Sequence, residues 1–236
     1  MRPPRRILIG AASYADARGA LLLARRIAAQ SRSVVGGLLV EEEFLDHLPR
    51  LGRQRVVTAS GTLHDVPTAR QVTQMLERDA KAFQAALSEL AMAAGPLERR
   101  RGELTVSAWN AARGWDVLVY GQRVVHGLRG HIVLISPPVG TVSDAAALAG
   151  DVAQATGTTT MTLGLELNAG ETADETYPTE VALLDRIGRL NCAAVVLDRG
   201  AGPFRTVEQL RKLLAAARCP VVLVGQATEA ATPAPA

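Results

Sequence analysis

Aromatic residues, cysteine and long apolar runs are all scarce in this chain of 236 residues. Aromatic residues make up only 3% of the sequence, so stacking platforms for single-stranded nucleic acid are not expected. The two cysteines, Cys192 and Cys219, form no CxxC motif, which argues against a disulfide framework and a cysteine-based metal site. No stretch approaches the roughly 18 apolar residues of a membrane-spanning helix. We therefore expect a soluble, cytoplasmic protein without a nucleic-acid or membrane partner.

The composition is that of an ordinary globular protein, with 48% apolar and 21% charged residues. At this length roughly 70–75% of the unfolded surface is buried on folding, which allows one large domain or two small ones. The net charge is +3, but the first 130 residues carry +7 and the remainder −4. Because the arginine clusters are scattered, we interpret this asymmetry as solvated or complementary faces rather than as a polyanion site.

The first half of the chain begins as a strand, a helix and a strand. Residues 6–12 (RILIGAA) form an apolar run without alternation, which is typical of a strand covered on both faces. Asp16 and Arg18 interrupt the apolar stretch too early for a signal peptide. Ser13 and Asp16 have the spacing of a capping box that opens a helix. Residues 33–40 (SVVGGLLV) then read as the second strand.

Beyond this strand the sequence predicts a loop-rich insertion and a long helix. The insertion runs from Glu41 to Asp65, and a helix of about 28 residues follows from Pro67 to the stop signal at Gly95-Pro96. The remaining expected elements are a strand at Leu104–Val106, a helical turn at Ala108–Arg113 and a buried strand at Asp116–Tyr120.

The second half repeats this order. A strand at residues 131–135 precedes a capping-box pattern at Thr141–Asp144, which predicts a helix that stops at Gly157. The later expectations are a strand at 160–167, a polar loop at 168–177, a helix at 178–190, a strand at 193–198, a helix capped at Thr206–Gln209, and a strand at 220–225.

Two similar starts, at Arg6 and Ile132, indicate a degenerate tandem repeat. We predict an α/β fold of two Rossmann-like units with mainly parallel sheets flanked by helices. The first unit spans residues 1–129 and contains the long second helix, and the second spans 130–225. Residues 226–236, rich in Ala, Thr and Pro, are predicted to be a disordered tail. One continuous sheet is the competing architecture.

Several of these segments resemble the universal stress protein family. The sequence from Arg6 to Leu21 follows that family's first strand and helix without a gap, and residues 116–121 (DVLVYG) look like its fourth strand. In the second half, residues 194–198 (AVVLD) and 219–224 (CPVVLV) look like its fourth and terminal strands. The resemblance covers most of the chain in outline, and it implies a Rossmann-like fold.

The ATP-binding members of this family have an Asp at the end of strand one, near the adenine. The comparison places Ala12 at that position in the first half, and Ser136 or Pro137 in the second. Neither half therefore keeps the acid.

Those members also carry a phosphate loop of the form G-x2-G-x9-G-[S/T], whose small residues let backbone amides approach the phosphates. Gly121 begins such a loop but lacks the second glycine, and the segment Gly200-Ala-Gly202-Pro203 has no matching downstream glycine. A formal match runs from Gly127 to Thr141, but its nine intervening residues read as a strand. These departures argue against ATP binding in both halves.

The carboxyl ends of the predicted strands are nevertheless the best candidate sites, because open α/β sheets bind ligands there. We interpret Ser13 as a helix cap rather than as a nucleophile, and for Asp198-Arg199 we favour a salt-bridged strand end over a ligand contact. The candidate ligand-binding residues are Ala12, Ser13, Gly121, Gln122 and Arg123 in the first half, and Asp198, Arg199, Gly200 and Gly202 in the second.

Other chemistry finds little support. No G-x-S-x-G elbow marks a serine nucleophile, and packing is the default role of Trp109 and Trp115. The remaining residues of interest lack metal-site spacing and are interpreted as solvated: His47, His64, His126, His131, and the acidic run Glu41–Glu43 with Asp46.

The resemblance implies a non-enzymatic regulatory or scaffolding protein of the stress response that has lost most of the ATP-binding motif. It would act through a protein partner or a weakly bound small ligand, with no metal and no cofactor. Self-association is expected, either as a pseudo-dimer of the two halves or as a homodimer, and the apolar strand Val221–Val224 suits edge pairing between units. Two alternatives stay open: an ATP-binding universal stress protein with weak hydrolysis, and a small transferase or flavoprotein-like subunit.

Overall fold

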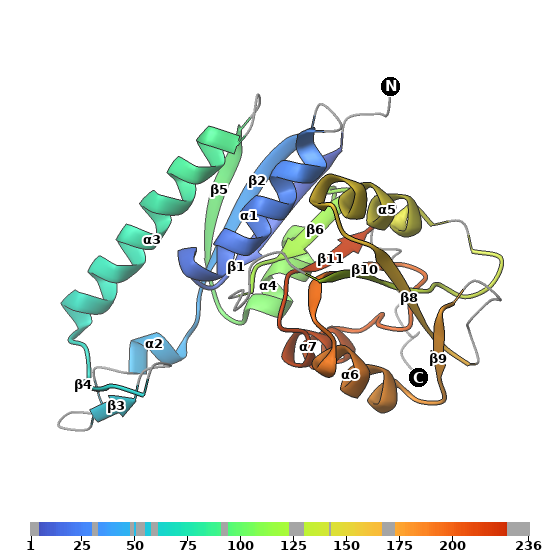
Figure 1. Cartoon of the computed structure of the whole chain (residues 1–236). Coiled ribbons are helices and arrows are strands. Elements are labelled where there is room, and N and C mark those ends of the chain that lie inside the picture. Colours follow the sequence, from blue (N-terminus) through green and yellow to red (C-terminus); the bar gives the residue numbers. More distant parts are fainter. Residues whose placement is uncertain are drawn as a thin grey trace, which may run out of the picture.

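A single nine-stranded sheet forms the centre of the protein (Figure 1). In this computed structural model the described residues are 5–29, 33–47, 50, 55–57, 61–90, 94–122, 130–141, 143–166 and 173–225. The sheet order is β5-β2-β1-β6-β11-β10-β7-β8-β9. The α/β class and the mainly parallel strands are therefore as predicted, and the strands form one continuous sheet. The predicted tail at 226–236 lies outside the described residues.

We divide the sheet into two strand groups by position in the chain. The first strand group and its helices are β1 (Arg6–Ala11), α1 (Tyr14–Ala29), β2 (Val34–Glu41), α3 (Ala69–Leu90), β5 (Ala94–Arg101), α4 (Leu104–Ala111) and β6 (Val117–Tyr120). The second comprises β7 (His131–Ile135), α5 (Ala145–Thr156), β8 (Thr160–Leu165), β9 (Glu175–Tyr177), α6 (Glu180–Arg189), β10 (Cys192–Asp198), α7 (Val207–Ala216) and β11 (Val221–Val224). The insertion contains α2 (Phe44–His47) and the hairpin β3 (Arg55–Val57) and β4 (Leu63–Asp65).

The two groups meet at one antiparallel seam. Strands β6 and β11 pair with Tyr120 opposite Val221 and Val117 opposite Val224, whereas the other pairings in this sheet are parallel. The last strand, which was expected to pair between units, pairs with β6 on this side. Since the strand directions reverse at the seam, the carboxyl ends of the two groups point to opposite ends of the sheet.

Helices cover both faces of the sheet, which explains the apolar strands without alternation. Helices α1, α3 and α5 pack on one face, around residues such as Leu23, Phe83 and Leu148. Helices α4, α6 and α7 pack on the other, around residues such as Leu183 and Leu213. No helix in the described part of the chain has the length and apolar character that crossing a membrane requires.

Local capping explains where several helices begin. Both bonds of the predicted Thr206–Gln209 capping box form at the start of α7. The box predicted at Thr141–Asp144 is wrong, because Asp144 makes no side-chain cap bond and Ser143 Oγ instead accepts the Ala145 N–H at 3.1 Å. As predicted, the helix stops at Gly157, whose φ of 66° is favourable only for glycine.

Two strands and two helices differ from the prediction. The long helix ends at Leu90, and Gly95-Pro96, predicted to stop it, lies inside the edge strand β5. Arginines fill the second half of that strand, and edge strands tolerate such charge because they pair on one side only. Residues 104–106 begin α4 instead of forming a strand. The predicted loop at 168–177 contains the three-residue strand β9.

Candidate functional sites at the strand ends and helices

The candidate residues fall at two sites on opposite ends of the sheet. The first strand end lies where β1 and β6 finish, and contains Ala12, Ser13, Gly121 and Gln122. The second lies where β7 and β10 finish, and contains the segment 198–202. Because β11 runs antiparallel to β6, Asp198 is level with Val117 near the start of that strand. The structure therefore does not bring the two predicted sets together. Arg123 lies outside the described residues.

Gly121 at the first strand end permits a close contact between β6 and α1. Its N–H donates to the Gly10 carbonyl at 2.7 Å. A Cβ atom at this position would lie 2.9 Å from the Asp16 carbonyl oxygen and 3.0 Å from the Ala11 Cβ. The packing of the strand end therefore accounts for this glycine.

Side chains at the first strand end are engaged within the chain. Ser13 Oγ accepts the Asp16 N–H at 3.1 Å and donates to Asp16 Oδ2 at 2.5 Å, so its capping role is confirmed. The Tyr14 N–H at the start of α1 donates to Asp79 Oδ2 of α3 at 3.3 Å. Gln122 Nε2 donates to the Leu214 carbonyl of α7 at 2.6 Å, which ties the two strand groups together.

Asp198 dominates the second strand end. The residue is only 8% exposed. Oδ1 accepts the N–H groups of Gly200 and Ala201, both at 2.8 Å, and Oδ2 accepts the Ser143 hydroxyl at 2.6 Å. Consecutive amides of this kind form an anion-binding nest. Here the protein's own carboxylate occupies the nest.

The neighbouring glycine and serine complete this arrangement. The Gly202 N–H donates to the Asp198 carbonyl at 3.2 Å, and a Cβ on Gly202 would lie 2.7 Å from that oxygen. Glycine is therefore needed to close the turn. Sequence reasoning missed Ser143, because its position within the capping-box pattern gave it no role of its own.

Arg199 has no salt-bridge partner among the residues that the structure describes, so the predicted salt-bridged strand end is not observed there. The residue is 3% exposed, and its guanidinium donates to the carbonyls of Trp109 and Ala112 at the end of α4. Its central carbon also lies 4.2 Å from the centroid of the Trp109 ring. Burial lowers the pKa of Arg199, since the charged form loses solvation. This arginine stabilises the contact between the strand groups and is not available to a ligand.

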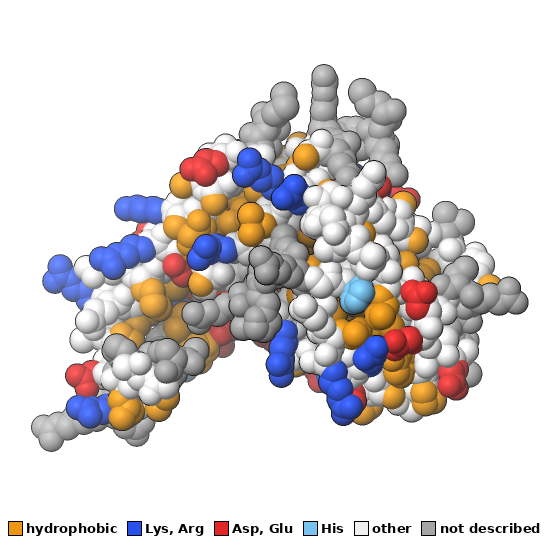
Figure 2. Space-filling view, viewed as in Figure 1, with side chains coloured by type: hydrophobic (Ala, Val, Ile, Leu, Met, Phe, Trp, Pro, Cys, Tyr) orange, Lys and Arg blue, Asp and Glu red, His pale blue; other side chains and the backbone are white. Residues whose placement is uncertain are grey.

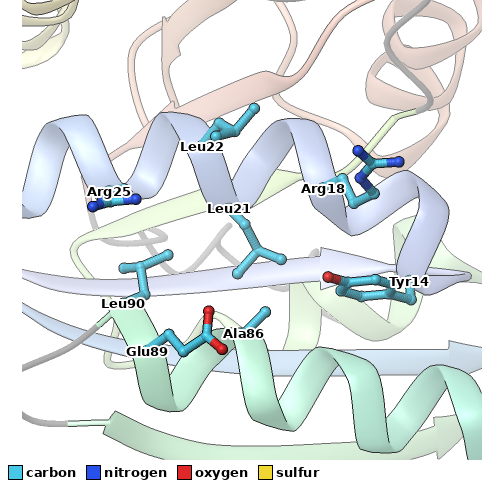
Figure 3. Close-up of a pocket in the computed structure, with 8 residues that line it drawn as sticks. All are labelled: Tyr14, Arg18, Leu21, Leu22, Arg25, Ala86, Glu89 and Leu90. Atoms are coloured by element: carbon cyan, nitrogen blue, oxygen red, sulfur yellow. The ribbon is translucent and has the colours of Figure 1, made fainter.

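A groove between α1 and α3 was missed by sequence reasoning (Figure 3). Its volume is about 200 Å³. Within the described part of the chain, neither Arg18 nor Arg25 on its wall has an ion-pair partner. Leu22 is 54% exposed, and Figure 2 shows hydrophobic and basic side chains gathered over α1 and α3. The lining residues are Tyr14, Arg18, Leu21, Leu22, Arg25, Ala86, Glu89 and Leu90.

This groove combines an apolar floor with positive charge. Leu21 is 6% exposed and lies at the base of the groove, between the two helices. Such a surface suits a ligand that is partly apolar and carries an anionic group. The only feature of the sequence that pointed to this groove was Leu22, an apolar residue beside the buried stripe of α1.

Metal chemistry has no site in the described residues, where no cluster of three His, Cys, Asp or Glu side chains occurs. His131 Nδ1 lies 2.8 Å from Thr159 Oγ1, and His47 is exposed. His126 and the side chains of Asp46 and His64 lie outside the described part.

Comparison with solved structures defines the class of fold. A universal stress protein from Archaeoglobus fulgidus DSM 4304 matches with a TM-score of 0.53 and 13% identity, covering 93% of this chain and 96% of that chain. This chain therefore has the fold of a universal stress protein, as its sequence resemblance implied. No protein-family model matches the sequence, and no curated protein matches it either.

Two further structures match more weakly. The cytoplasmic domain of a prokaryotic cation chloride cotransporter has a TM-score of 0.43 and 10% identity, with 96% of this chain and 97% of that chain covered. Universal stress protein UspA from Lactobacillus plantarum has a TM-score of 0.30 and 11% identity, with 95% and 99% covered.

Proposed function

We propose that this chain is a non-enzymatic, universal-stress-like regulatory or scaffolding protein that has lost most of the ATP-binding motif. It acts in the cytoplasm through a protein partner or a weakly bound small ligand, and it uses no cofactor. The fold of the Archaeoglobus fulgidus protein supports the family assignment. The observation that best supports the proposed loss of nucleotide binding is the hydrogen bonding of Asp198, whose carboxylate takes up the Gly200 and Ala201 amides at the second strand end.

We further propose that residues 1–129 and 130–225 are two units that associate as a pseudo-dimer. We number the strands of each group by their order in the chain and follow them from the outer edge of the sheet to the seam. The first group then has the order third, second, first, fourth. The second group has the order third, second, first, fourth, fifth. This shared order and the antiparallel seam between β6 and β11 support a duplicated unit.

For the small ligand, the groove between α1 and α3 favours an amphipathic carboxylate. Arg18 and Arg25 would bind the anionic group, while Leu21 and Leu22 would contact the alkyl chain. Decanoate should raise the melting temperature of the full chain, and decylamine should not. A variant with Arg18→Glu and Arg25→Glu should lose the decanoate response. An equal response to both compounds, or a response that survives the double substitution, would remove this ligand class.

A nucleotide-binding protein with weak hydrolysis is the second candidate, and the first strand end favours it. Ala12 and Gly121 are small residues at that end, and the carboxylates described there, Asp16 and Asp79, bond to Ser13 and Tyr14 at the start of α1 and not to Gly121. Small residues of this kind allow a phosphate to approach backbone amides.

Thermal unfolding of the full chain separates the two candidates. We expect no change in melting temperature on adding millimolar Mg-ATP, with Mg-tripolyphosphate as the control for a general anion effect. A rise of several degrees with Mg-ATP alone would establish nucleotide binding, by mass action on the folded state. Ala12→Leu would then abolish the rise if the nucleotide occupies the first strand end. Release of phosphate from ATP, measured in the same samples, would test the non-enzymatic assignment.

A further inference from the structure

The chain has only two cysteines, and the fold brings them together. Cys192 begins β10, and Cys219 lies two residues before the start of β11 at Val221. These strands are parallel neighbours in which Val195 pairs with Val221, and the Val195 N–H donates to the Pro220 carbonyl at 3.0 Å. The two thiols, 27 positions apart in the sequence, therefore lie at the same end of adjacent strands.

A β-bulge puts both thiols on the same face of the sheet. In β10, Val195 packs on the face covered by α4, α6 and α7, while Ala194 packs on the opposite face. Regular alternation would place Cys192 on the side of Ala194. However, the register of β10 against β7 shifts between Cys192 and Ala194, and Cys192 packs against the same apolar cluster that contains Cys219. Bulges commonly redirect a side chain in this way.

The two thiols differ in accessibility and in acidity. Cys219 is 1% exposed, whereas Cys192 is half-buried. The hydrogen bond from the Cys219 thiol lowers the pKa of Cys192, and the charge of Arg186 adds to this effect, although burial opposes it. The same hydrogen bond and burial raise the pKa of Cys219. Cys192 is thus the thiol that reacts first, and Cys219 is placed to resolve its product.

We propose that Cys192 and Cys219 form an oxidative modification site, in which a peroxide converts the neighbouring thiols to an intramolecular disulfide. The Cys192 thiolate attacks one peroxide oxygen, so that an S–O bond forms, the O–O bond breaks and the first hydroxide leaves as water after taking a proton. The Cys219 sulfur then attacks the sulfenic sulfur, which releases the second oxygen as water with the Cys219 proton. Two thiols and one hydrogen peroxide give one disulfide and two waters. This site goes beyond the proposed regulatory function.

The disulfide would join the start of β10 covalently to the segment that leads into β11. These are the last two strands in the chain. Strand β11 also forms the antiparallel seam with β6. Oxidation would therefore restrain β11, the strand by which the second strand group pairs with the first. Because a cross-link restricts the unfolded chain, the oxidised protein should melt several degrees above the reduced protein.

Peptide mapping tests this proposal on the full chain. The protein is treated with one equivalent of hydrogen peroxide, blocked with N-ethylmaleimide and digested with trypsin. Cleavage after Arg189, Arg199 and Arg218 puts each cysteine in its own peptide, residues 190–199 and 219–236. We expect these two peptides to be linked in monomeric protein, with both titratable thiols lost and the linkage reversed by dithiothreitol.

Two variants keep the test decisive. With one equivalent of peroxide, Cys219→Ser should leave Cys192 as the sulfenic acid or in an intermolecular disulfide, and a second equivalent should take the sulfenic acid on to sulfinic acid. Cys192→Ser should slow the reaction of the remaining thiol. The melting temperature of each variant should not rise on oxidation, whereas that of the wild type should. Two unlinked peptides after oxidation of the wild type, or a disulfide that forms only between chains, would overturn the proposal.

Discussion

Arg199 of the second strand group stacks on Trp109 of the first, with its guanidinium carbon 4.2 Å from the centroid of the ring. The same guanidinium donates to the Trp109 and Ala112 carbonyls at the end of α4. Carbonyl groups at a helix end attract a cation. One side chain beyond the seam thus contributes packing, hydrogen bonds and charge to the contact between the groups.

Replacing Arg199 should destabilise this contact. Arg199→Ala should lower the free energy of unfolding by about 2–3 kcal/mol, because it removes the stacking and leaves buried carbonyls without a donor. Arg199→Met should cost less, since it keeps the apolar stem and removes a buried charge whose Nε has no partner among the described residues. Urea unfolding measures both values. Arg205→Ala, at an exposed position, is the control, and equal losses for Arg199→Ala and Arg205→Ala would contradict this role.

Removing the Asp198 carboxylate should empty the amide nest. Asp198→Ala should cost about 2–4 kcal/mol, because the Gly200 and Ala201 amides and the Ser143 hydroxyl lose their acceptor. Inorganic phosphate should then restore part of the melting temperature of this variant, while leaving the wild type unchanged. Asp185→Ala, whose carboxylate pairs with Arg189 on the surface, is the matched control. Phosphate stabilisation of equal size in all three proteins would argue against a nest.

The ion pair between Glu103, at the start of α4, and Arg211 of α7 should make the contact between these two helices sensitive to acid. The hydrogen bond from Arg211 holds the pKa of Glu103 below its ordinary value of 4.5, although burial opposes this. Since the pKa is lower in the folded state, the pair stabilises the fold above the unfolded pKa, and this stability is lost as pH falls through the folded value.

Glu103→Gln should therefore reduce stability near neutral pH and make little difference in strong acid. The effect should be no more than about 1 kcal/mol, because both side chains are partly exposed. Chemical denaturation at a series of pH values measures the difference between wild type and variant. Glu98→Gln, which affects an ion pair within β5, is the control away from the seam. A difference for Glu103→Gln that stays constant with pH would exclude this account.

Two glycines should respond in opposite directions to the same substitution. A Cβ on Gly36 of β2 would lie 2.4 Å from the Cη2 atom of Trp115, so Gly36→Ala should cost about 1–3 kcal/mol through overpacking. Gly150 lies inside α5, exposed and with no atom within 4 Å of the added Cβ. Gly150→Ala should stabilise the protein by about 0.5–1 kcal/mol. Thermal unfolding checks both signs, and tryptophan fluorescence should change only for Gly36→Ala.

Local sequence signals located most helices and strands correctly, because their causes are local. The box at Thr206–Gln209 satisfies free amides within one helical turn. The apolar run at 193–198 predicts a strand buried on both faces, as observed for β10. Strand β5 was missed, because Arg99–Arg101 are compatible with a strand only at an edge of the sheet. Edge position is not a local property.

The candidate site was predictable only in part. The order of strands and helices was enough to direct attention to Asp198 and Gly121, since the carboxyl ends of parallel strands are where these folds bind ligands. The partners of these residues were not predictable. Ser143 lies 55 positions from Asp198, and the Leu214 carbonyl that accepts from Gln122 lies 92 positions away.

By itself, the sequence determined the α/β class and the positions of most elements, because periodicity and caps are properties of short segments. Only the tertiary structure decided that β6 and β11 pair antiparallel, and this pairing sends the two strand ends to opposite ends of one sheet. It also decided that the Ser143 hydroxyl reaches the Asp198 carboxylate and that Cys192 packs against the apolar cluster that contains Cys219. Those outcomes depend on strand direction and register, which are fixed when distant segments pack and not by the residues beside each site.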